Sequence, residues 1–227
     1  LDDAEMPAVI YTTFRKMGIP KFTIYLNNRK ILSGLFEALG LNEKVADILR
    51  IVDKIAKIGE EAVREELEKL FVPSDKMDTL LDFIKTKGDV ACVLKKLSEM
   101  PFDSEVFRLG IEELKSVTDA LAAQGVDKSY YQLDLSIVRG LDYYTGTIYE
   151  TLLDEMPGVG SICSGGRYDD LASFYTTQKF PGVGISIGLS RLFHILSENG
   201  WMKTGAFVPT DVLVLPMSAE EMLFALS

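Results

Sequence analysis

The sequence predicts an α+β protein in which helices flank an antiparallel sheet and a long, all-helical segment is inserted. Two observations support this fold class. Apolar residues alternate in strand fashion over residues 22–26, 130–138 and 145–153. Between residues 41 and 126 they instead recur at helical spacing almost throughout. Strands on both sides of a helical stretch indicate one sheet whose chain is interrupted by an insertion.

The first forty residues predict a helix, a strand and a second helix. The first helix ends at Gly18, a residue suited to a C-terminal cap. The strand over 22–26 leads into Asn27 and Asn28, and asparagine favours the N-cap of a helix. The helix that follows ends at Gly40. This strand and its two helices are expected to belong to the core of the fold.

Residues 42–126 carry helical stripes but no catalytic constellation. Ser104 is a candidate N-cap for the last of these helices, and Gly125 is a candidate stop. The many glutamates near residue 60 are most simply a solvated helix face. We expect this segment to form a helical lobe separate from the sheet.

Strand periodicity returns at residues 130–138, and that strand ends at Arg139. We expect it to form an antiparallel pair with the strand over 145–153. A short strand is predicted over 161–163, and a strand over 183–187 leads into a helix that begins near Gly188. A side chain at the end of a strand often lines a site, which makes Arg139 a candidate functional residue.

Composition limits the functional classes. The chain has 227 residues, 47% of them hydrophobic, and a formal net charge of −10. Such a charge argues against general coating of nucleic acid, although a local basic patch could still contact a shaped RNA. Cys92 and Cys163 form no metal-ligand spacing, and we expect reduced thiols, no protein-bound metal and a cytoplasmic location. The sequence contains no apolar run that predicts a membrane span.

Three blocks concentrate the unusual chemistry. They read RGLDYYTGTIYE over 139–150, SICSGGRYDDL over 161–171 and PGVGISIGLSRL over 181–192. Arginine grips carboxylates and phosphates with a rigid fork of donors, and tyrosines offer flat walls with a polar tip. Taken together and in this order, the blocks resemble the histidine-specific signatures and the third class II motif of histidyl-tRNA synthetases. The strand and helix around Asn27 and Asn28 also resemble that family's catalytic core.

The resemblance implies an aminoacyl-tRNA ligase with a class II synthetase-like sheet, and it implies a role for individual residues. Arg139 matches the arginine held between the substrate carboxylate and the α-phosphate. Tyr144 and Tyr168 match the tyrosines that line the histidine pocket. Arg191 matches the third-motif arginine that stacks on adenine. The remaining expected contacts are backbone approaches at glycines: to the substrate at Gly165 and Gly166, and to ATP at Gly188.

Two neighbouring side chains receive other interpretations. Tyr143 is expected to point away from Tyr144 into the core. Arg167 is expected to be structural and paired with Asp169 or Asp170.

The resemblance also implies domains and partners. It predicts core residues over 1–41 and 127–207, a helical insertion over 42–126 that meets the acceptor end of tRNA, and the start of an anticodon-binding domain over 208–227. Histidine, Mg²⁺-bound ATP and histidine tRNA are the implied substrates, and a homodimer is the implied assembly. The first and second class II motifs are absent, so we expect a C-terminal part of the catalytic core that is inactive alone.

Residues 211–217 read as a strand that lacks its sheet, followed by a capping box at Ser218 and Glu221. Two other readings of the whole chain remain open. One is the synthetase-like regulatory subunit of ATP phosphoribosyltransferase, which would bind histidine without charging tRNA. The other is a scaffold protein with no ligand.

Overall fold

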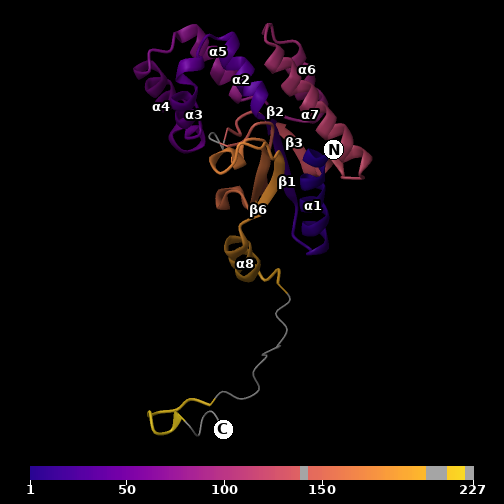
Figure 1. Cartoon of the computed structure of the whole chain (residues 1–227), viewed down its shortest axis with the longest axis vertical. Helices are drawn as coiled ribbons and strands as arrows, with labels where there is room; N and C mark the ends of the chain where they lie inside the picture. The colour runs from indigo at the N-terminus through magenta and orange to yellow at the C-terminus, as the bar shows by residue number, and fades with distance from the viewer. Residues whose placement is uncertain (139–142, 203–213, 223–227) are drawn as a thin grey trace.

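The six strands of the described chain form a single sheet, shown in Figure 1. The computed structural model describes residues 1–138, 143–202 and 214–222. The strand order is β2-β3-β1-β4-β5-β6. The strands are β1 (Phe22–Asn28), β2 (Lys87–Gly88), β3 (Tyr131–Asp134), β4 (Thr147–Leu153), β5 (Cys163–Tyr168) and β6 (Gly182–Ile187).

The sheet is mixed rather than purely antiparallel. β1 pairs with β3 in parallel, with Ile24 opposite Tyr131, and every other pairing is antiparallel. The predicted antiparallel pair between 130–138 and 145–153 is therefore wrong, because β1 lies between β3 and β4. β3 also ends earlier than predicted. The Asp134 carboxylate accepts hydrogen bonds from the N–H (2.9 Å) and hydroxyl (2.5 Å) of Ser136, and this local turn replaces further strand pairing.

Helices occupy the predicted stretches. They are α1 (Asp2–Lys16), α2 (Arg29–Ala38), α3 (Val45–Val52), α4 (Ile55–Lys69), α5 (Ser74–Ile84), α6 (Val90–Ser98), α7 (Glu105–Ala123) and α8 (Leu189–Glu198). Two predicted caps are confirmed. The Asn28 side chain accepts from the N–H of Lys30 at the start of α2, and the Ser104 hydroxyl accepts from the N–H of Phe107 in α7.

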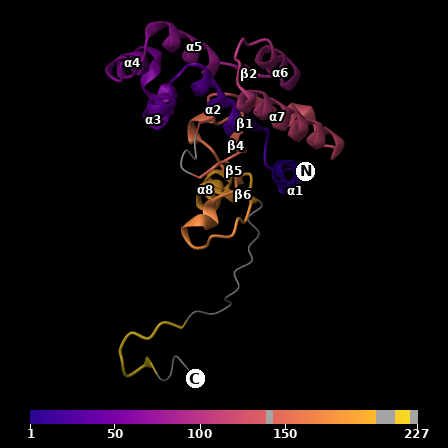
Figure 2. The ribbon, with the colours of Figure 1, turned by 45° about the horizontal axis from the view of Figure 1, so that its top comes forward.

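The inserted segment is not a fully separate lobe. α3 packs on α4 and α4 packs on α5, and Val52 and Ile55 line a pocket together with Tyr25 of β1. α7 packs against α1, α2 and β1 (Figures 1 and 2). α2 and α7 approach so closely that a Cβ on Gly34 would lie 2.4 Å from the backbone nitrogen of Phe107. β2, from the same segment, extends the sheet at its edge. The insertion is thus anchored in the core by its last helix and by one edge strand.

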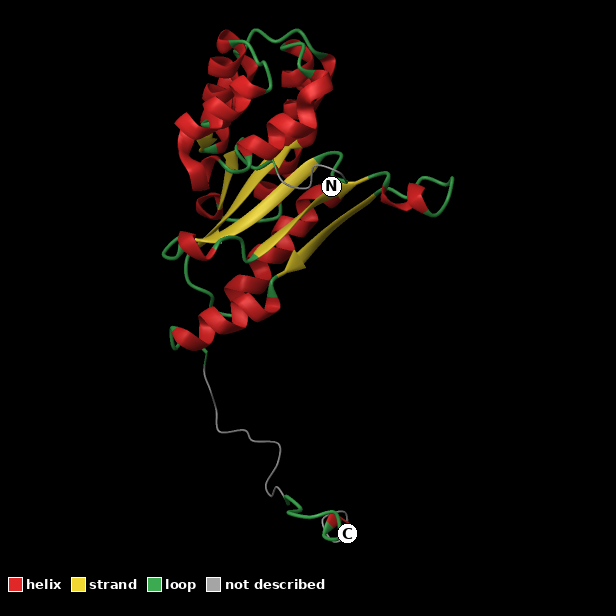
Figure 3. Ribbon diagram, turned by 90° about the vertical axis from the view of Figure 1, so that its left-hand side faces the viewer, coloured by secondary structure: helices red, strands yellow, loops and turns green. Residues whose placement is uncertain are grey.

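The two faces of the sheet differ in character. One face carries apolar residues such as Ile24, Leu26 and Leu153, which belong to the main hydrophobic core. Helices cover this apolar face of the sheet (Figure 3). There α1 contacts β5 and β6, and α7 contacts β1. By the pairing register, the other face carries Tyr25, Glu150, Ser164 and Tyr168 on neighbouring strands. This second face holds the candidate site.

The described residues near the C-terminus lie outside that core. Val214, Leu215 and Met217 are exposed, and residues 214–217 do not form the predicted strand. The predicted capping box is also not formed, because Glu221 accepts its hydrogen bond from the N–H of Met217 instead. Residues 211–213 of that predicted strand lie outside the described residues. Across the described chain, no helix is both long and apolar enough to cross a membrane.

Candidate active site

The Tyr168 ring lies over the backbone of the neighbouring strand. Tyr168 pairs with Gly182 across the β5–β6 ladder. A Cβ placed on Gly182 would lie 2.5 Å from Cε2 of Tyr168, and a Cβ on Gly184 would lie 3.2 Å from its phenol oxygen. Any side chain at these positions would displace the ring, so the two glycines create its seat.

A second glycine seat holds Tyr144. A Cβ on Gly166 would lie 2.8 Å from Cδ1 of Tyr144 and 2.7 Å from the carbonyl oxygen of Thr147. Gly166 pairs with Gly184, so both tyrosine seats lie on the same face of adjacent strands. The structure therefore brings the predicted residues Tyr144, Tyr168 and Gly166 together.

Gly165 faces the other side of the strand, and Tyr143 differs from expectation. Because side chains alternate along a strand, Gly165 faces the helix-covered side, opposite to the tyrosines. Its absent side chain serves strand packing, since a Cβ there would lie 2.1 Å from the carbonyl oxygen of Gly184. Tyr143 is 46% exposed, and its ring lies against that of Tyr144 with 4.3 Å between centroids. The prediction of a buried Tyr143 is wrong because residues 143–146 precede β4 and do not alternate as a strand.

Arg191 and Gly188 line a second hollow on this part of the sheet, with a volume of about 330 Å³. Nη1 of Arg191 donates to the carbonyl of Ser161 at 2.6 Å, and the N–H of Gly188 donates to the carbonyl of Ile162 at 2.9 Å. Other residues of the hollow include Ser164 and Ser186. The predicted ATP-binding residues thus share one cavity.

Strand geometry relates the two sites. Ser164, Gly166 and Tyr168 face the same side of β5, and alternate residues of a strand lie about 7 Å apart. A ligand held between the tyrosines would therefore lie about one or two such steps from the hollow at Arg191. This spacing allows two small ligands to meet on one face of the sheet.

Arg139 lies outside the described residues, but the chain leading to it is fixed. The buried Asn27 amide donates to the carbonyls of Leu135 (3.4 Å) and Ile137 (2.8 Å). Its oxygen accepts from the N–H of Asn28 at 2.7 Å, which fixes the orientation of the amide. Asn27 thus anchors the turn after β3, at positions where strand pairing has ended.

Burial favours the neutral form of two groups near the site. It raises the pKa of the Tyr144 phenol above its ordinary value, and the neighbouring Tyr143 hydroxyl adds to the shift. Burial also raises the pKa of the Cys163 thiol to about 12. Both groups are neutral near pH 7, so Tyr144 can donate a hydrogen bond and Cys163 is a buried apolar group rather than a nucleophile.

Known proteins resemble this chain over most of its length. The family model described as histidyl-tRNA synthetase matches residues 1–192. The chain belongs to the histidyl-tRNA synthetase family. It is 50% identical over 198 residues to the histidine–tRNA ligase of Clostridium tetani, covering 87% of this chain and 45% of that protein. It is 42% identical over 220 residues to that of Finegoldia magna, covering 97% and 51%.

Solved structures give the same result. The crystal structure of histidyl-tRNA synthetase from Nostoc sp. PCC 7120 matches with a TM-score of 0.87 at 42% identity, over 99% of this chain and 53% of that one. A structure titled ATP phosphoribosyltransferase regulatory subunit/histidyl-tRNA synthetase, from Bacillus halodurans C, has a TM-score of 0.72 at 20% identity and shares the fold. The chain spans about half the length of the curated family members it matches.

Sequence reasoning missed one side chain beside the family blocks. Arg167 pairs with Asp169 as expected, but its closer partner is Asp3 in the first turn of α1. The hydrogen bond to Asp3 raises the pKa of Arg167 further above its ordinary value. An acidic residue in the first turn is ordinary for any helix, so the sequence held no signal for a contact across 164 positions.

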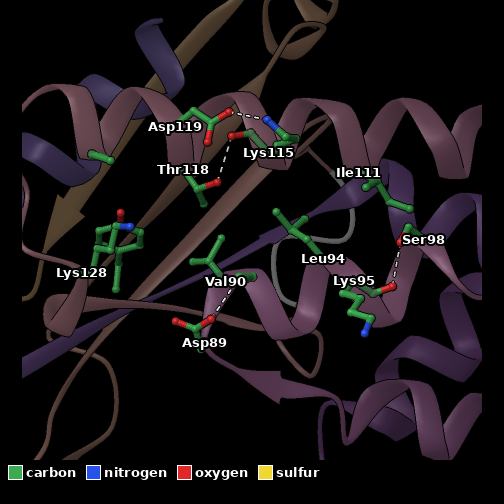
Figure 4. Close-up of a pocket in the computed structure, with 13 residues that line it drawn as sticks. Asp89, Val90, Leu94, Lys95, Ser98, Ile111, Lys115, Thr118, Asp119 and Lys128 are labelled. Atoms are coloured by element: carbon green, nitrogen blue, oxygen red, sulfur yellow. Dashed lines mark hydrogen bonds and ion pairs between the residues drawn. The ribbon is translucent and has the colours of Figure 1, made fainter.

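A separate cavity of about 560 Å³ lies between α6 and α7 (Figure 4). Its floor is apolar, with Val90, Leu94 and Ile111, and its rim carries both lysines and aspartates. No residue that lines it comes from β4, β5 or β6, so it is distinct from the tyrosine site. The described residues contain no group of three or more His, Cys, Asp or Glu that could hold a metal ion.

Proposed function

We propose that this chain supplies the histidine pocket and third motif of a histidyl-tRNA synthetase. The whole protein would activate histidine with ATP to histidyl-adenylate and transfer it to histidine tRNA. The observation that carries the proposal is the pair of tyrosines seated on glycines, on the same sheet face as the hollow at Arg191. The family matches at 42–50% identity support it.

The tyrosine site suits an imidazole. Two phenols can donate to or accept from the ring nitrogens, and their rings provide apolar walls. The Tyr144 phenol holds its proton at neutral pH, so it can donate to an unprotonated nitrogen. The backbone at Gly166 lies directly against the Tyr144 ring, with no side chain between them.

The hollow at Arg191 suits the adenine of ATP, with Mg²⁺ arriving as part of the substrate complex. Ser161 holds one end of the guanidinium through its carbonyl. The planar face of such a guanidinium can stack on an aromatic ring. Adenylation then brings the histidine carboxylate against the α-phosphate, and two anions must meet. Arg139, which follows the turn anchored by Asn27, is assigned to neutralise this charge.

The assignment is tested by histidine-dependent ATP–pyrophosphate exchange in the whole protein. Arg139→Ala should slow exchange roughly 10²–10³-fold, as the loss of one charge-stabilising group does elsewhere. The KM for ATP should change little, since this charge matters most in the transition state. Arg139→Lys should restore little, because an ammonium lacks the rigid fork.

Arg50→Ala is the matched control, because Arg50 is an exposed arginine of α3 that pairs only with a helix neighbour, Asp47, in the described contacts. It should leave exchange unchanged. An exchange rate for Arg139→Ala within twofold of wild type would contradict the assignment. Tyr144→Phe should chiefly raise the KM for histidine, by about two- to thirteen-fold, because it removes one hydrogen bond worth about 0.5–1.5 kcal/mol.

Partners and location are part of the same proposal. The exposed Leu189 and Phe193 lie on α8, which follows edge strand β6, and such an apolar edge is suited to covering by a partner. We propose a homodimer, to be measured by light scattering of the whole protein. Free thiols at Cys92 and Cys163 support a cytoplasmic location. The regulatory-subunit alternative rests on shared fold alone, and charging of histidine tRNA by the whole protein would reject it.

A further inference from the structure

A charged cluster lies on the side of β5 opposite to the tyrosine site. Arg167 and Tyr168 are adjacent on the strand, so their side chains point to opposite faces. Nε and Nη2 of Arg167 donate to Oδ1 of Asp3 at 2.7 and 2.5 Å. The two side chains are only 25% and 12% exposed, so this is a largely desolvated ion pair. It ties the first turn of α1 to the centre of the second family block.

The cluster reaches the backbone on both sides of Tyr168. Nη1 of Arg167 donates to Oδ1 of Asp169 at 3.2 Å. Oδ2 of Asp169 accepts from the hydroxyl of Thr145 at 2.7 Å. The N–H of Thr145 donates to the carbonyl of Arg167 at 2.8 Å. Residues 167 and 169 are therefore fixed relative to residue 145.

The same cluster fixes the chain that follows Tyr144. The second oxygen of Asp3, Oδ2, accepts from the hydroxyl of Thr147 at 2.7 Å. A Cβ on Gly146 would lie 3.0 Å from Cδ of Arg167, so the Arg167 stem lies directly against this turn. Residues 145–147 thus contact Asp3, Arg167 and Asp169 at once. Tyr144 stands immediately before this fixed segment.

Stability alone is a weak reason for such a cluster. Desolvating two charges costs roughly as much as their attraction returns, so a buried ion pair often adds little net stability. Such a pair can instead select one arrangement of the groups that it joins. The groups joined here flank the two tyrosines of the proposed pocket, from three segments far apart in sequence.

We infer that Asp3 and Arg167 are positioning residues for histidine binding, which act from the helix-covered face by holding Tyr144 and Tyr168 at the spacing that the ligand requires. This inference rests on the proposed function. It assigns specificity for the amino acid to an ion pair that touches neither substrate. ATP binding at Arg191 lies outside its reach, because no contact of the cluster extends to the residues that line that hollow in the described chain.

Asp3→Asn tests the inference in the whole protein. The amide keeps the shape of the carboxylate but removes the charge that fixes the guanidinium. We expect the KM for histidine in ATP–pyrophosphate exchange to rise roughly tenfold, since displacements near 1 Å can cost up to about 10²-fold. The KM for ATP should stay within about twofold. A general loss of structure would instead affect both substrates.

A double-mutant cycle isolates the mechanism. If Asp3 acts through the tyrosines, Asp3→Asn should raise the KM for histidine less in a Tyr144→Phe background than in wild type, because residues acting through one contact are not additive. Equal factors in both backgrounds would overturn the inference.

The matched control is Glu113→Gln, which weakens the Lys30–Glu113 ion pair between α2 and α7, where the side chains are 29% and 31% exposed. It should lower the melting temperature without changing the KM for histidine. If Asp3→Asn does not fold, Thr145→Val removes the contacts of the Thr145 hydroxyl with Asp169 and with the carbonyl of Arg167, and it should give the same selective rise in KM. Unchanged histidine KM in a folded variant would overturn the inference while leaving the proposed function intact. A wild-type protein without histidine-dependent exchange would overturn both.

Discussion

Glycines make close contacts in two regions of this chain, and they do so for different purposes. At the α2–α7 contact, Gly34 meets the backbone of Phe107, and Gly110 lies so close to α2 that a Cβ would be 2.7 Å from the nitrogen of Ile31. At the tyrosine site, Gly182 and Gly184 meet the ring of Tyr168. In the first region backbone faces backbone, and in the second backbone faces a side chain.

This difference predicts what an added methyl group at a glycine does in each region. A helix backbone cannot shift without moving the whole helix, so an added methyl group at α2 or α7 disturbs the packing of the core. A tyrosine ring can rotate away from an added methyl group. The chain then stays folded but loses the position of a ligand-binding group. The first region therefore governs stability, and the second governs binding.

Gly34→Ala should have the largest effect. The methyl group would lie 2.4 Å from a backbone nitrogen, so α2 and α7 must separate. Overpacking typically costs 1–3 kcal/mol, and we expect a loss of about 3 kcal/mol in the free energy of unfolding because backbone has the least freedom to yield. Urea denaturation of this chain measures it. A loss below about 0.5 kcal/mol would show that the two helices can slide apart freely.

Gly182→Ala should leave the fold largely intact but damage the site. A Cβ there would lie 2.5 Å from Cε2 of Tyr168 and push the ring towards the ligand space. We expect kcat/KM for histidine in the exchange reaction to fall roughly 10²-fold, in line with a misplacement near 1 Å.

Gly158→Ala is the matched control, because no atom lies within 4 Å of a Cβ at that position. It should change neither stability nor exchange. If Gly182→Ala unfolded the chain as readily as Gly34→Ala, the distinction between the two regions would be lost.

Tyr149→Phe should have the smallest effect, and on stability alone. Tyr149 faces the helix-covered side of β4, and among the described atoms its buried hydroxyl has no hydrogen-bond partner. An unsatisfied buried group costs about 1–3 kcal/mol, so its removal should raise the free energy of unfolding by about 1 kcal/mol. Histidine binding should be unchanged, in contrast to Tyr144→Phe.

The pH dependence supplies a second measurement. Burial raises the pKa of Tyr149 in the folded state, whereas in the unfolded state it stays near 10. Below pH 10 both states hold the proton. As the pH rises above 10 the unfolded state ionises first, so stability falls by up to about 1.4 kcal/mol per pH unit for this group. The fall should be shallower in Tyr149→Phe, and an identical alkaline profile would contradict the assignment.

The sequence predicted elements and blocks better than it predicted their arrangement. The caps at Asn28 and Ser104 were readable because capping depends on residues within three positions. The glycine and tyrosine content of the three blocks indicated a small-ligand site for the same local reason. The order of the strands in the sheet cannot be predicted from neighbouring residues in this way. Nothing in the alternation of residues 130–138 distinguishes pairing with β1 from pairing with β4.

The sequence also did not predict side-chain contacts between residues that are far apart along the chain. Asp3 and Asn27 look like an ordinary first-turn acid and an ordinary N-cap candidate. Their partners are Arg167 and the carbonyls of residues 135 and 137, which only the assembled fold brings near. The capping residue proved to be Asn28, and this freed Asn27 for the turn after β3. Adjacent identical residues can thus have unrelated roles that periodicity does not separate.

The parallel pairing of β1 with β3 has a consequence for how the chain folds. Asn27 must find Leu135 across 108 positions, and contacts this distant form slowly because the closure of a long loop precedes any gain from pairing. The helices between them consist of local contacts and can form within microseconds. Contact between α2 and α7 then draws the ends of that loop together. We therefore expect the insertion to shorten the search for the central strands, so that the helical half of the chain guides the assembly of the sheet on which the site is built.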